Sequence, residues 1–239
     1  MSTKTAIVTG ASSGIGLGIT EALLEHGYNV VATSRTASQS GQLRRSARLV
    51  IVDGDVGVAR TAELVVNAAR DFGGLDLLVN NAGIFIPKPF TEYTQDDFAR
   101  LLSTNVAGFF HMTQHALRVM EAEARGHIVN IGTSLVKQPI AGVPSALSIL
   151  TKGGIEAATA SLAIEYASRG IRVNTIAAGI IDTPMHPSEK HEALKGLSPA
   201  KRLGNVREMA EAVLYLEGAT FVSGQILHLD GGAHAGKWS

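Results

Sequence analysis

Residues 9–16, Thr-Gly-Ala-Ser-Ser-Gly-Ile-Gly, lie between an apolar run and a segment with helical periodicity. Gly10 and Gly14 allow backbone torsions and close approaches that a Cβ atom would hinder, and Gly16 lets the following helix pack close to the strand. A turn of this kind points free amides and the positive end of a helix dipole at a pyrophosphate. An ordinary strand-to-helix turn is the alternative. The residues expected to bind a dinucleotide here are Gly10, Ser12, Ser13, Gly14, Ile15 and Gly16.

The second apolar run, residues 30–35, ends in serine and arginine. An acidic residue at this distance from the glycines would bind the adenine ribose hydroxyls of NAD. Ser34 instead removes the repulsion against a 2′-phosphate, and the guanidinium of Arg35 can make charge-assisted bonds to it. The sequence therefore favours NADP(H), with NAD(H) as the alternative. Arg44 and Arg45 are other candidates for the positive charge, and a solvated Arg35 is the plain alternative.

The elements that must position these residues alternate between short apolar runs and longer segments with helical periodicity. Such runs are typical of buried parallel strands, because helices cover both faces of their sheet. One helix is expected over about residues 144–169, ended by Gly170. The pattern predicts a single doubly wound, Rossmann-type α/β domain over residues 1–239, with a seven-stranded parallel sheet flanked by helices. The strands are expected at Thr5–Thr9, Asn29–Thr33, Arg48–Val52, Leu75–Asn80, Gly126–Ile131, Arg172–Ile176 and Gln225–Leu229.

The composition indicates a small-molecule partner. Lysine plus arginine and aspartate plus glutamate both number 21, so no net charge favours nucleic acid or an anionic membrane surface. The chain has no cysteine, which excludes disulfides, thiolate nucleophiles and cysteine-ligated metal, and no metal site is expected. It opens without the basic and apolar regions of a signal peptide and has no apolar run long enough to span a bilayer. We therefore expect a cytoplasmic protein.

Residues 181–201 interrupt the alternating pattern with three prolines, two histidines and several charges. We expect a mobile substrate loop, because this topology places ligands beyond the carboxyl ends of the strands. A plain surface excursion is the alternative. The substrate pocket would draw on residues 135–145 and 181–201, and neither segment carries a motif that identifies the substrate.

Further short motifs follow the glycine-rich turn in order: Asp55-Val56, Asn80-Asn81-Ala82-Gly83, Asn105, Lys152, residues 170–174, Ser223-Gly224-Gln225 and Asp230-Gly231-Gly232. Over essentially its whole length the chain thus resembles the short-chain dehydrogenase/reductase family. The resemblance implies that Asp55 accepts a hydrogen bond from the adenine amine, beside the Val56 backbone. It also implies that Asn81, Ala82 and Gly83 form the floor against the adenosine ribose. A strand-end carboxylate in a turn and a tight Asn-Gly connection are the local alternatives.

Members of that family pair a tyrosine with a lysine four residues later on a helix, supported by serine and asparagine. The spacing puts both side chains on one helical face, where the ammonium lowers the pKa of the phenol for proton exchange with the substrate. Lys152 is present, but Ser148 stands where the phenol is expected, and its hydroxyl is shorter and far less acidic. The surrounding residues hold no aromatic side chain. Elsewhere, Tyr93 is expected to anchor a loop, and Tyr166 and Tyr215 to be core residues.

The remaining site residues are implied by the same resemblance. Asn105 would perturb its helix and hold a proton-relay water, with a satisfied helix amide as the alternative. Ser134 is preferred for orienting the carbonyl because of its residue type; Thr133 is the alternative, and either could cap a turn. Lys152 would also bond the nicotinamide ribose, with an exposed surface lysine as the alternative. The loop expected at the nicotinamide carboxamide contains Gly179, Ile181 and Thr183, which would act through the Ile181 backbone and the Thr183 hydroxyl.

These features predict an NADP(H)-dependent dehydrogenase/reductase that transfers hydride between nicotinamide and a small carbonyl or alcohol substrate by a modified proton-transfer mechanism. His186, His111, a water held by Asn105 and Lys152, or the substrate itself would supply the proton. The alternatives are a catalytically weak dinucleotide-binding sensor or assembly subunit, and a non-redox enzyme on the same fold. The resemblance also implies a homodimer or homotetramer, with residues 221–229 as a contact.

Overall fold

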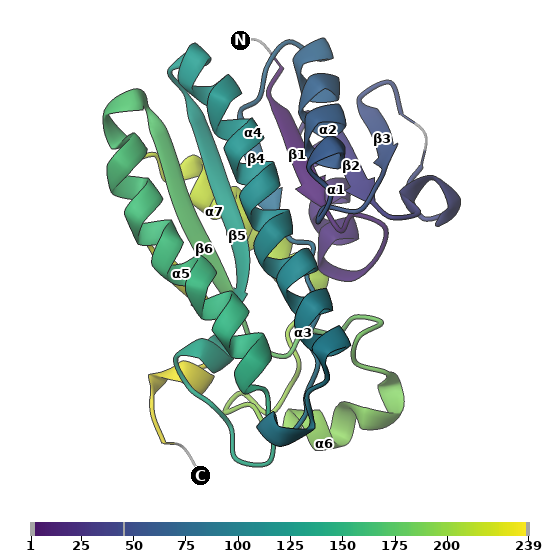
Figure 1. Ribbon diagram of the computed structural model, residues 1–239, viewed down its shortest axis with the longest axis vertical. Coiled ribbons are helices and arrows are strands. Elements are labelled where there is room, and N and C mark those ends of the chain that lie inside the picture. Colours follow the sequence, from purple (N-terminus) through teal and green to yellow (C-terminus); the bar gives the residue numbers. More distant parts are fainter. Residues whose placement is uncertain (1–2, 45, 238–239) are drawn as a thin grey trace.

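Seven short strands form one parallel sheet in the computed structural model, which describes residues 3–44 and 46–237 (Figure 1). The strand order is β3-β2-β1-β4-β5-β6-β7, so the predicted seven-stranded, doubly wound sheet is confirmed. The direction of winding reverses between β1 and β4, and ligands of such sheets bind at the carboxyl ends of the strands beside this reversal. The strands are β1 Thr5–Thr9, β2 Asn29–Ser34, β3 Leu49–Asp53, β4 Leu77–Asn80, β5 Gly126–Thr133, β6 Ile171–Ala178 and β7 Ile226–Leu229.

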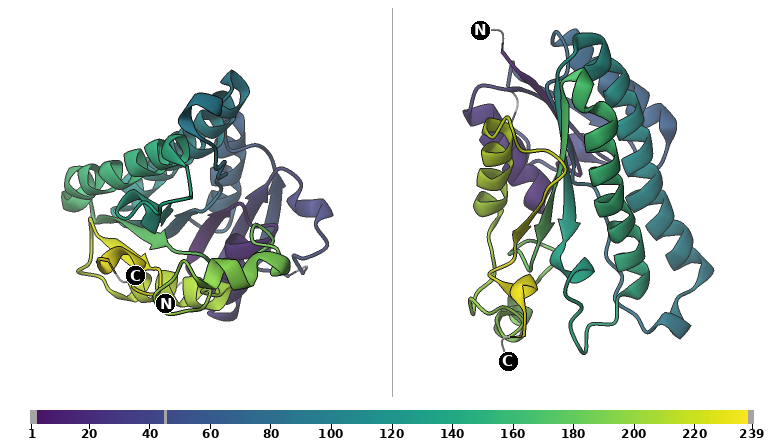
Figure 2. Two further views of the ribbon diagram at one scale, coloured as in Figure 1. Left: turned by 90° about the horizontal axis from the view of Figure 1, so that it is seen from below. Right: turned by 90° about the vertical axis from the view of Figure 1, so that its left-hand side faces the viewer.

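Helices cover both faces of the sheet (Figure 2). On one face, Ile19 of α1 and Met209 of α7 belong to one buried apolar cluster with side chains from the sheet. On the other face, α2, α4 and α5 bury a second cluster that includes Val65 and Met112. The α-helices are α1 Gly14–Glu25, α2 Ala59–Asp71, α3 Gln95–Leu101, α4 Gly108–Glu123, α5 Ala146–Tyr166, α6 His191–Lys195 and α7 Val206–Gly218. The short helical turns are η1 Ala37–Gln39, η2 Phe90–Glu92, η3 Leu102–Ala107, η4 Ser134–Val136, η5 Ala167–Arg169, η6 Ser188–Lys190 and η7 Ala233–Ala235.

Most of the strand boundaries predicted from the sequence lie within two residues of those in the structure. The helix expected over residues 144–169 is present as α5 and η5, and Gly170 ends it with φ +72°. Residues 181–201 are less irregular than expected, because η6 and α6 lie within them. The prediction of Tyr215 as a core residue is wrong: it lies on the outer side of α7 and is 60% exposed. Among the described residues, none of the helices is both long enough and apolar enough to cross a membrane.

A buried polar cluster lies at the amino edge of the sheet, where β5 and β6 begin, opposite the carboxyl edge at which ligands are expected. His127 of β5 is 1% exposed, and its Nδ1 lies 2.9 Å from Glu217 Oε2 at the end of α7. The side-chain amide of Asn174 donates to His127 Nε2 (3.0 Å), so Nδ1 carries the ring proton and the imidazole is neutral. Burial lowers the pKa of His127. Glu217 is also buried, yet hydrogen bonds from His127 and Lys4 hold its pKa below the ordinary value.

We expect this cluster to make stability fall in acid. The unfolded chain binds a proton at His127 below about pH 6.5, and the folded protein resists that proton because the pKa is lowered. The His127 contribution to stability is therefore complete at higher pH and declines as pH falls below about 6.5, by at most about 1.4 kcal/mol per pH unit. Thermal unfolding between pH 7.5 and 5.5 measures it.

His127→Asn is expected to flatten this pH dependence, even if its stability at pH 7.5 is lower. His26→Asn is the matched control, since His26 lies exposed at the end of α1. An unchanged slope in His127→Asn would contradict the assignment.

Candidate active site

Three glycines shape the turn between β1 and α1, which holds all six residues predicted to bind phosphate. Gly10 and Gly14 have φ values of +65° and +54°, in the left-handed region that favours glycine. A Cβ at Gly16 would lie 2.3 Å from the Gly10 carbonyl oxygen, so only glycine lets α1 start this close to β1. Ser13 precedes α1 in an extended conformation, and its side chain makes no capping bond within the described chain. The first amides of α1 therefore remain for an anion.

A polar link joins the ends of β1 and β4 beside this turn. The hydroxyl of Thr9 accepts hydrogen bonds from the amides of Asn81 (3.0 Å) and Ala82 (2.9 Å). In return, Asn81 Nδ2 donates to the carbonyl oxygens of Thr9 (2.8 Å) and Gly10 (3.3 Å). Residues 81–83 are thus fixed to the glycine-rich turn by the protein itself. Thr9 opens the glycine-rich motif, but the sequence assigned it no role; its position as the last residue of the strand was the available signal.

Ser34 and Arg35 lie at the end of β2, where the predicted 2′-phosphate contact needs them. Ser34 Oγ is buried and has no hydrogen-bond partner within the described residues. Such an orphaned hydroxyl is unusual in a folded protein and fits a group that a ligand completes. Arg35 follows Ser34 in the chain and is exposed. Arg44 is also exposed, and Arg45 lies outside the described residues.

Asp55 and Val56 follow β3 at the same edge of the sheet. The carboxylate of Asp55 accepts a hydrogen bond from the Gly57 amide (2.8 Å), so the turn considered as a local alternative does form. Val56 is buried, and a Cβ on Gly108 would lie 2.7 Å from its side chain. The turn and this packing fix both residues at the edge, and their contact with adenine stays a prediction.

Lys152 extends from α5 to the carboxyl edge of the sheet. Its ammonium donates to the Ile131 carbonyl oxygen of β5 (2.8 Å), and a Cβ on Gly83 would lie 2.9 Å from Nζ. Loss of hydration lowers the pKa of Lys152 to about 8. The residue is partly buried, so it is not the exposed surface lysine considered as the alternative. An amine that titrates close to neutral pH is suited to exchanging protons.

Asn105 lies in η3, a π-helical turn between α3 and α4, which is the predicted local perturbation of the helix. Its Oδ1 accepts from the Ile84 amide (2.9 Å), and its Nδ2 donates to the Ile84 carbonyl oxygen (3.0 Å). Nδ2 also donates to Thr151 Oγ1 (2.9 Å). The side chain therefore hydrogen-bonds to both the amide and the carbonyl oxygen of Ile84, as the backbone of a neighbouring strand would. One lone pair of Oδ1 remains for the predicted relay water.

Ser148 hydrogen-bonds in the same way to Ile86, two residues further along this segment. Its hydroxyl accepts from the Ile86 amide (3.0 Å) and donates to the Ile86 carbonyl oxygen (3.3 Å). Tyr93 donates its phenol to that carbonyl oxygen as well (2.6 Å), so the loop anchor predicted for Tyr93 is present. Ser148 is 1% exposed. Its hydroxyl therefore supports the segment after β4, and residues 84–86 join Ser148, Asn105 and Tyr93 into one unit.

Thr133 and Ser134, the two candidates for the carbonyl-orienting hydroxyl, divide their roles. Thr133 ends β5, and its Oγ1 accepts from the Leu135 amide (3.3 Å), so it caps η4. Ser134 is the first residue of η4 and is buried. The turn-capping alternative applies to Thr133, and Ser134 stays the predicted carbonyl-orienting residue.

The loop after β6 reaches the phosphate-binding turn. A Cβ on Gly179 would lie 2.7 Å from Asp230 Cα, so glycine is required at this position. Ile181 is buried in the core. A Cβ on Gly14 would lie 3.3 Å from two carbon atoms of Thr183, which places the loop directly against the start of α1. The predicted nicotinamide and pyrophosphate segments are therefore neighbours.

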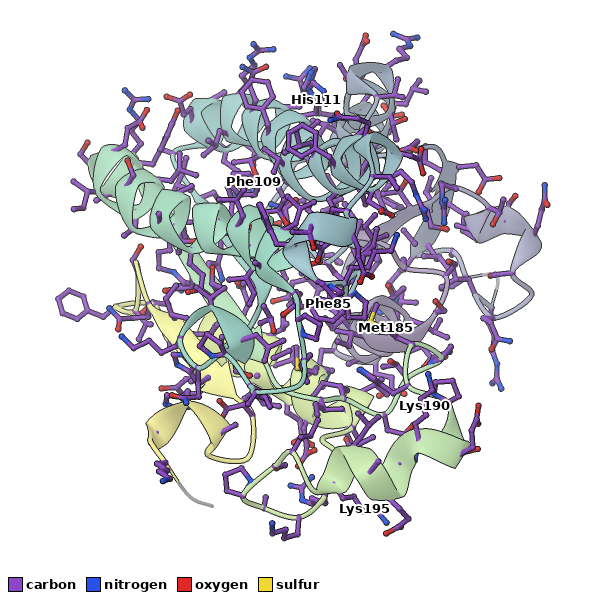
Figure 3. All side chains as sticks on the ribbon, turned by 60° about the horizontal axis from the view of Figure 1, so that its bottom comes forward. Phe85, Phe109, His111, Met185, Lys190 and Lys195 are labelled. Atoms are coloured by element: carbon purple, nitrogen blue, oxygen red, sulfur yellow. The ribbon has the colours of Figure 1, made fainter. Side chains whose placement is uncertain are left out.

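The two histidines predicted as proton sources lie in different places. His186 Nδ1 is 2.8 Å from the Ile181 carbonyl oxygen, a hydrogen bond inside the loop. His111 belongs to α4, and its ring meets the edge of Phe110 at 5.3 Å. Figure 3 shows His111 on the outer helical layer, well separated from Met185 of the loop after β6. His111 is therefore separated from the loop that holds His186, and its role as a proton source stays a prediction.

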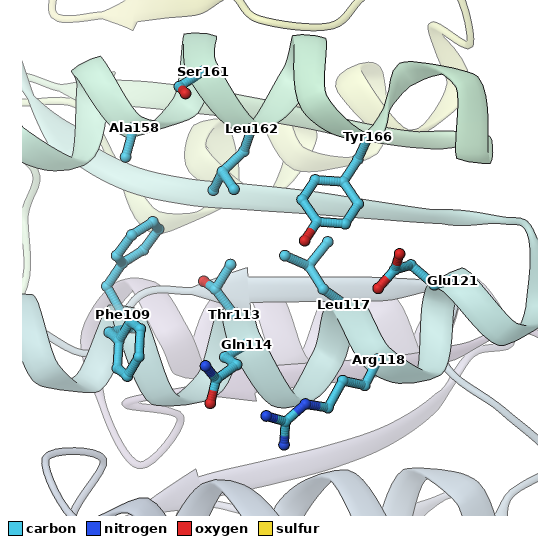
Figure 4. Close-up of a pocket in the computed structure, with 11 residues that line it drawn as sticks. Phe109, Thr113, Gln114, Leu117, Arg118, Glu121, Ala158, Ser161, Leu162 and Tyr166 are labelled. Atoms are coloured by element: carbon cyan, nitrogen blue, oxygen red, sulfur yellow. The ribbon is translucent and has the colours of Figure 1, made fainter.

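Two hollows differ in character. A groove of about 490 Å³ lies between α4 and α5 (Figure 4), and only residues of these helices, such as Leu117 and Tyr166, line it. Because it includes neither Lys152 nor the glycine-rich turn, it is not the candidate active site. A small, partly open space of about 10 Å³ is bordered instead by Lys152, Asn105 and Asn80, and its volume is about that needed for one water molecule.

Comparison with known proteins agrees with this geometry. The family model described as enoyl-(acyl carrier protein) reductase matches residues 10–234. The 3-oxoacyl-[acyl-carrier-protein] reductase of Vibrio cholerae is 37% identical over 243 residues, covering 97% of each chain. The cis-4-hydroxycyclohexanecarboxylate dehydrogenase of Sinomonas cyclohexanicum is 35% identical over 244 residues, covering 96% of each.

Solved structures match as fully. ElxO with NADP bound aligns with a TM-score of 0.90 and 29% identity, covering 98% of this chain and 100% of that one. The 3-ketoacyl-(acyl-carrier-protein) reductase of Brucella melitensis complexed with NADH aligns with a TM-score of 0.90 and 28% identity, covering 97% and 98%. With the glycine-rich turn, the π-helical Asn105 and the partly buried Lys152 at one edge of the sheet, the chain belongs to the short-chain dehydrogenase/reductase family of oxidoreductases.

Proposed function

We propose that this protein is an NADP(H)-dependent oxidoreductase that transfers hydride between nicotinamide and a small carbonyl or alcohol substrate. The observation that carries the proposal is the desolvated ammonium of Lys152, held on the Ile131 carbonyl oxygen beside Gly83. The orphaned hydroxyl of Ser34 favours the phosphorylated cofactor. NADP in the ElxO structure supports the same choice, and NADH in the Brucella reductase keeps NAD(H) as the alternative.

The residues present fit a dinucleotide. The first amides of α1 would hold the pyrophosphate, since Gly10 and Gly16 leave the space that a Cβ would fill. Ser34 and Arg35 would hold the 2′-phosphate. Lys152 would bond the nicotinamide ribose. The remaining contacts follow the predictions for Asp55, Val56, Asn81, Ala82, Gly83, Gly179, Ile181 and Thr183.

Lys152 takes the proton role that a phenol would otherwise fill. When bound, the nicotinamide supplies hydride for reduction or accepts it for oxidation. In reduction, an N–H of Lys152 gives its proton to the substrate oxygen whose carbon receives hydride, and the resulting amine takes a proton from water. In oxidation, the neutral amine accepts the hydroxyl proton of the alcohol. The Ile131 carbonyl oxygen holds Nζ in place, and the 10 Å³ space beside Asn105 has room for the resupplying water.

Lys152 is preferred to the other proton sources. His186 uses Nδ1 for a hydrogen bond within its own loop, so only Nε2 remains for proton exchange. His111 lies on the outer helical layer, well separated from Met185 (Figure 3). The hydroxyl of Ser148 serves both backbone groups of Ile86. Lys152 is the titratable group whose contacts and lowered pKa both suit the task.

Relatives indicate the substrate class. Their names describe the reduction of a 3-oxoacyl-[acyl-carrier-protein] and the dehydrogenation of cis-4-hydroxycyclohexanecarboxylate, so a ketone or secondary alcohol reacts in each. We propose the same functional group here. A short 3-oxoacyl thioester and 4-oxocyclohexanecarboxylate are the first two compounds to test with NADPH.

A catalytically weak dinucleotide-binding sensor is the second candidate function. The observation in its favour is the binding of Ser148 to Ile86 in place of a phenol. Tight binding of NADPH without its oxidation by a broad panel of ketones and aldehydes would favour the sensor. Substrate-dependent loss of reduced nicotinamide absorbance would favour the oxidoreductase.

We further propose a homodimer or homotetramer, and a cytoplasmic location stays a prediction. Phe221 is fully exposed at the start of the predicted contact, and Phe110 is 52% exposed beside the α4–α5 groove. Large apolar side chains left in water favour association.

Replacing Lys152 is expected to remove reduction. Lys152→Met should lower kcat/KM by about 100-fold or more, because proton transfer is lost. In the unmodified enzyme, reduction should be steady below pH 8 and fall above it, since the ammonium is the donor and its pKa is about 8. Oxidation should rise with pH over the same range. Arg70→Met, which removes an exposed charge in the last turn of α2, is the control. A reduction profile flat to pH 9.5 would contradict the role.

Replacing Ser148 is expected to have a smaller effect of a different kind. Ser148→Ala should lower kcat/KM by about 3- to 10-fold through loss of the Ile86 hydrogen bonds, and leave the pH profile unchanged. Ser148→Thr, which restores a hydroxyl, should recover part of the loss. A fall of 1,000-fold with a displaced pH profile would make Ser148 a proton donor.

Replacing Phe221 tests the assembly. Light scattering after size-exclusion chromatography is expected to give a dimer or tetramer for the unmodified protein and a smaller mass for Phe221→Asp, because an apolar contact is lost. A monomer in both cases would contradict self-association.

A further inference from the structure

The segment after β2 carries the residues proposed to recognise the 2′-phosphate. Arg35 is exposed at its start, and η1 follows at Ala37–Gln39. Ser34 anchors the segment, since its carbonyl oxygen accepts from the Gly54 amide (3.0 Å). The side chain of Arg35 can meet a phosphate only if this exposed segment keeps a defined path.

Asp53, the last residue of β3, holds that segment from the neighbouring strand. Asp53 is level with Ser34 in the β2–β3 register. Its Oδ1 accepts from the Ser38 amide (2.9 Å), and its Oδ2 accepts from the Ser38 hydroxyl. Both carboxylate oxygens are therefore directed at one residue of η1, and two donors of that residue are fixed at once.

Two simpler roles have to be separated from positioning. A carboxylate level with Ser34 could bond ribose hydroxyls of NAD through the lone pair that each oxygen keeps beside its Ser38 bond, and its removal would then weaken NADH binding. It could also repel a 2′-phosphate through its charge. The Ser38 hydrogen bonds lower the pKa of Asp53, so the group is ionised at neutral pH, and charge and hydrogen bonding must be tested separately.

We propose that Asp53 is a positioning residue for cofactor selection: by holding the amide and hydroxyl of Ser38, it sets the path of residues 35–39 and so presents Arg35 to the 2′-phosphate. The inference rests on the proposed use of NADP(H). It assigns to a strand-end carboxylate, outside the motifs of the chain, a share of the preference for the phosphorylated cofactor.

Binding affinities of the full-length protein test the proposal without catalysis. Dissociation constants for NADPH and NADH come from nicotinamide fluorescence, and those for 2′,5′-ADP and 5′-ADP from competition. Asp53→Ala is expected to weaken NADPH and 2′,5′-ADP about tenfold, because a charge-assisted pair of hydrogen bonds is lost. NADH and 5′-ADP should change less than about twofold and thereby report an intact fold.

Two variants separate the hydrogen bonds from the charge. Asp53→Asn keeps an oxygen for the Ser38 amide and an amide group that the Ser38 hydroxyl can meet, so NADPH affinity should stay within about twofold. Ser38→Ala should lie between the unmodified protein and Asp53→Ala. Asp71→Ala, at the exposed end of α2, is the control for removing a surface carboxylate and should change nothing.

Other outcomes overturn the proposal. Unchanged NADPH affinity in Asp53→Ala removes the role, and tighter NADPH binding in both Asp53 variants identifies repulsion instead. Equal losses for NADPH and NADH identify general destabilisation. If the unmodified protein binds neither dinucleotide, the proposed function fails too. If it prefers NADPH and Asp53→Ala keeps the same preference, only the present inference fails.

Discussion

The hydrogen-bonded link between Thr9 and residues 81–82 is the constraint on which the site depends. It joins β1 to β4 where the winding of the sheet reverses, the place at which adjacent loops leave in opposite directions. Asn81 returns two bonds to the carbonyls at the glycine-rich turn, so the turn and the start of the next segment form one rigid body. Gly16 then lets the start of α1 lie against the Gly10 carbonyl group, where a Cβ atom would come within 2.3 Å of the oxygen. A dinucleotide would meet amides that are already oriented.

Side chains that bond to the backbone also hold the segment after β4. Asn105 holds both backbone groups of Ile84, and Ser148 holds both backbone groups of Ile86, so two helices together replace a neighbouring strand. The hydroxyl of Ser148, at the position where the family resemblance predicted a phenol, thus has a structural partner. Lys152, one turn further along α5, has its ammonium on a backbone carbonyl oxygen and partly withdrawn from water.

The amino and carboxyl edges of the sheet differ in how their polar groups are satisfied. At the amino edge, the guanidinium of Arg172 donates to carbonyl oxygens at the end of α7, including that of Leu216 (2.8 Å). His127 and Glu217 complete a buried cluster there, in which every charge has a partner. At the carboxyl edge, by contrast, the Ser34 hydroxyl and the first amides of α1 lack partners within the described chain. A ligand would supply the bonds that these groups at the carboxyl edge lack, and the hydrogen bonds of the buried cluster stabilise the far edge.

The sequence by itself determined the parallel sheet, the glycine-rich turn and the position of Lys152, because apolar runs, glycine torsions and helical spacing are local properties. It could not predict the hydrogen bonds between Ser148 and Ile86, since residues 62 apart in sequence meet only after folding. Tyr215 failed as a core prediction for a related reason: periodicity gives a helix its apolar face but not the angle at which that face packs. Only the tertiary structure decided which polar groups are satisfied by the protein and which are left for a ligand, because hydrogen bonds between distant segments set that balance.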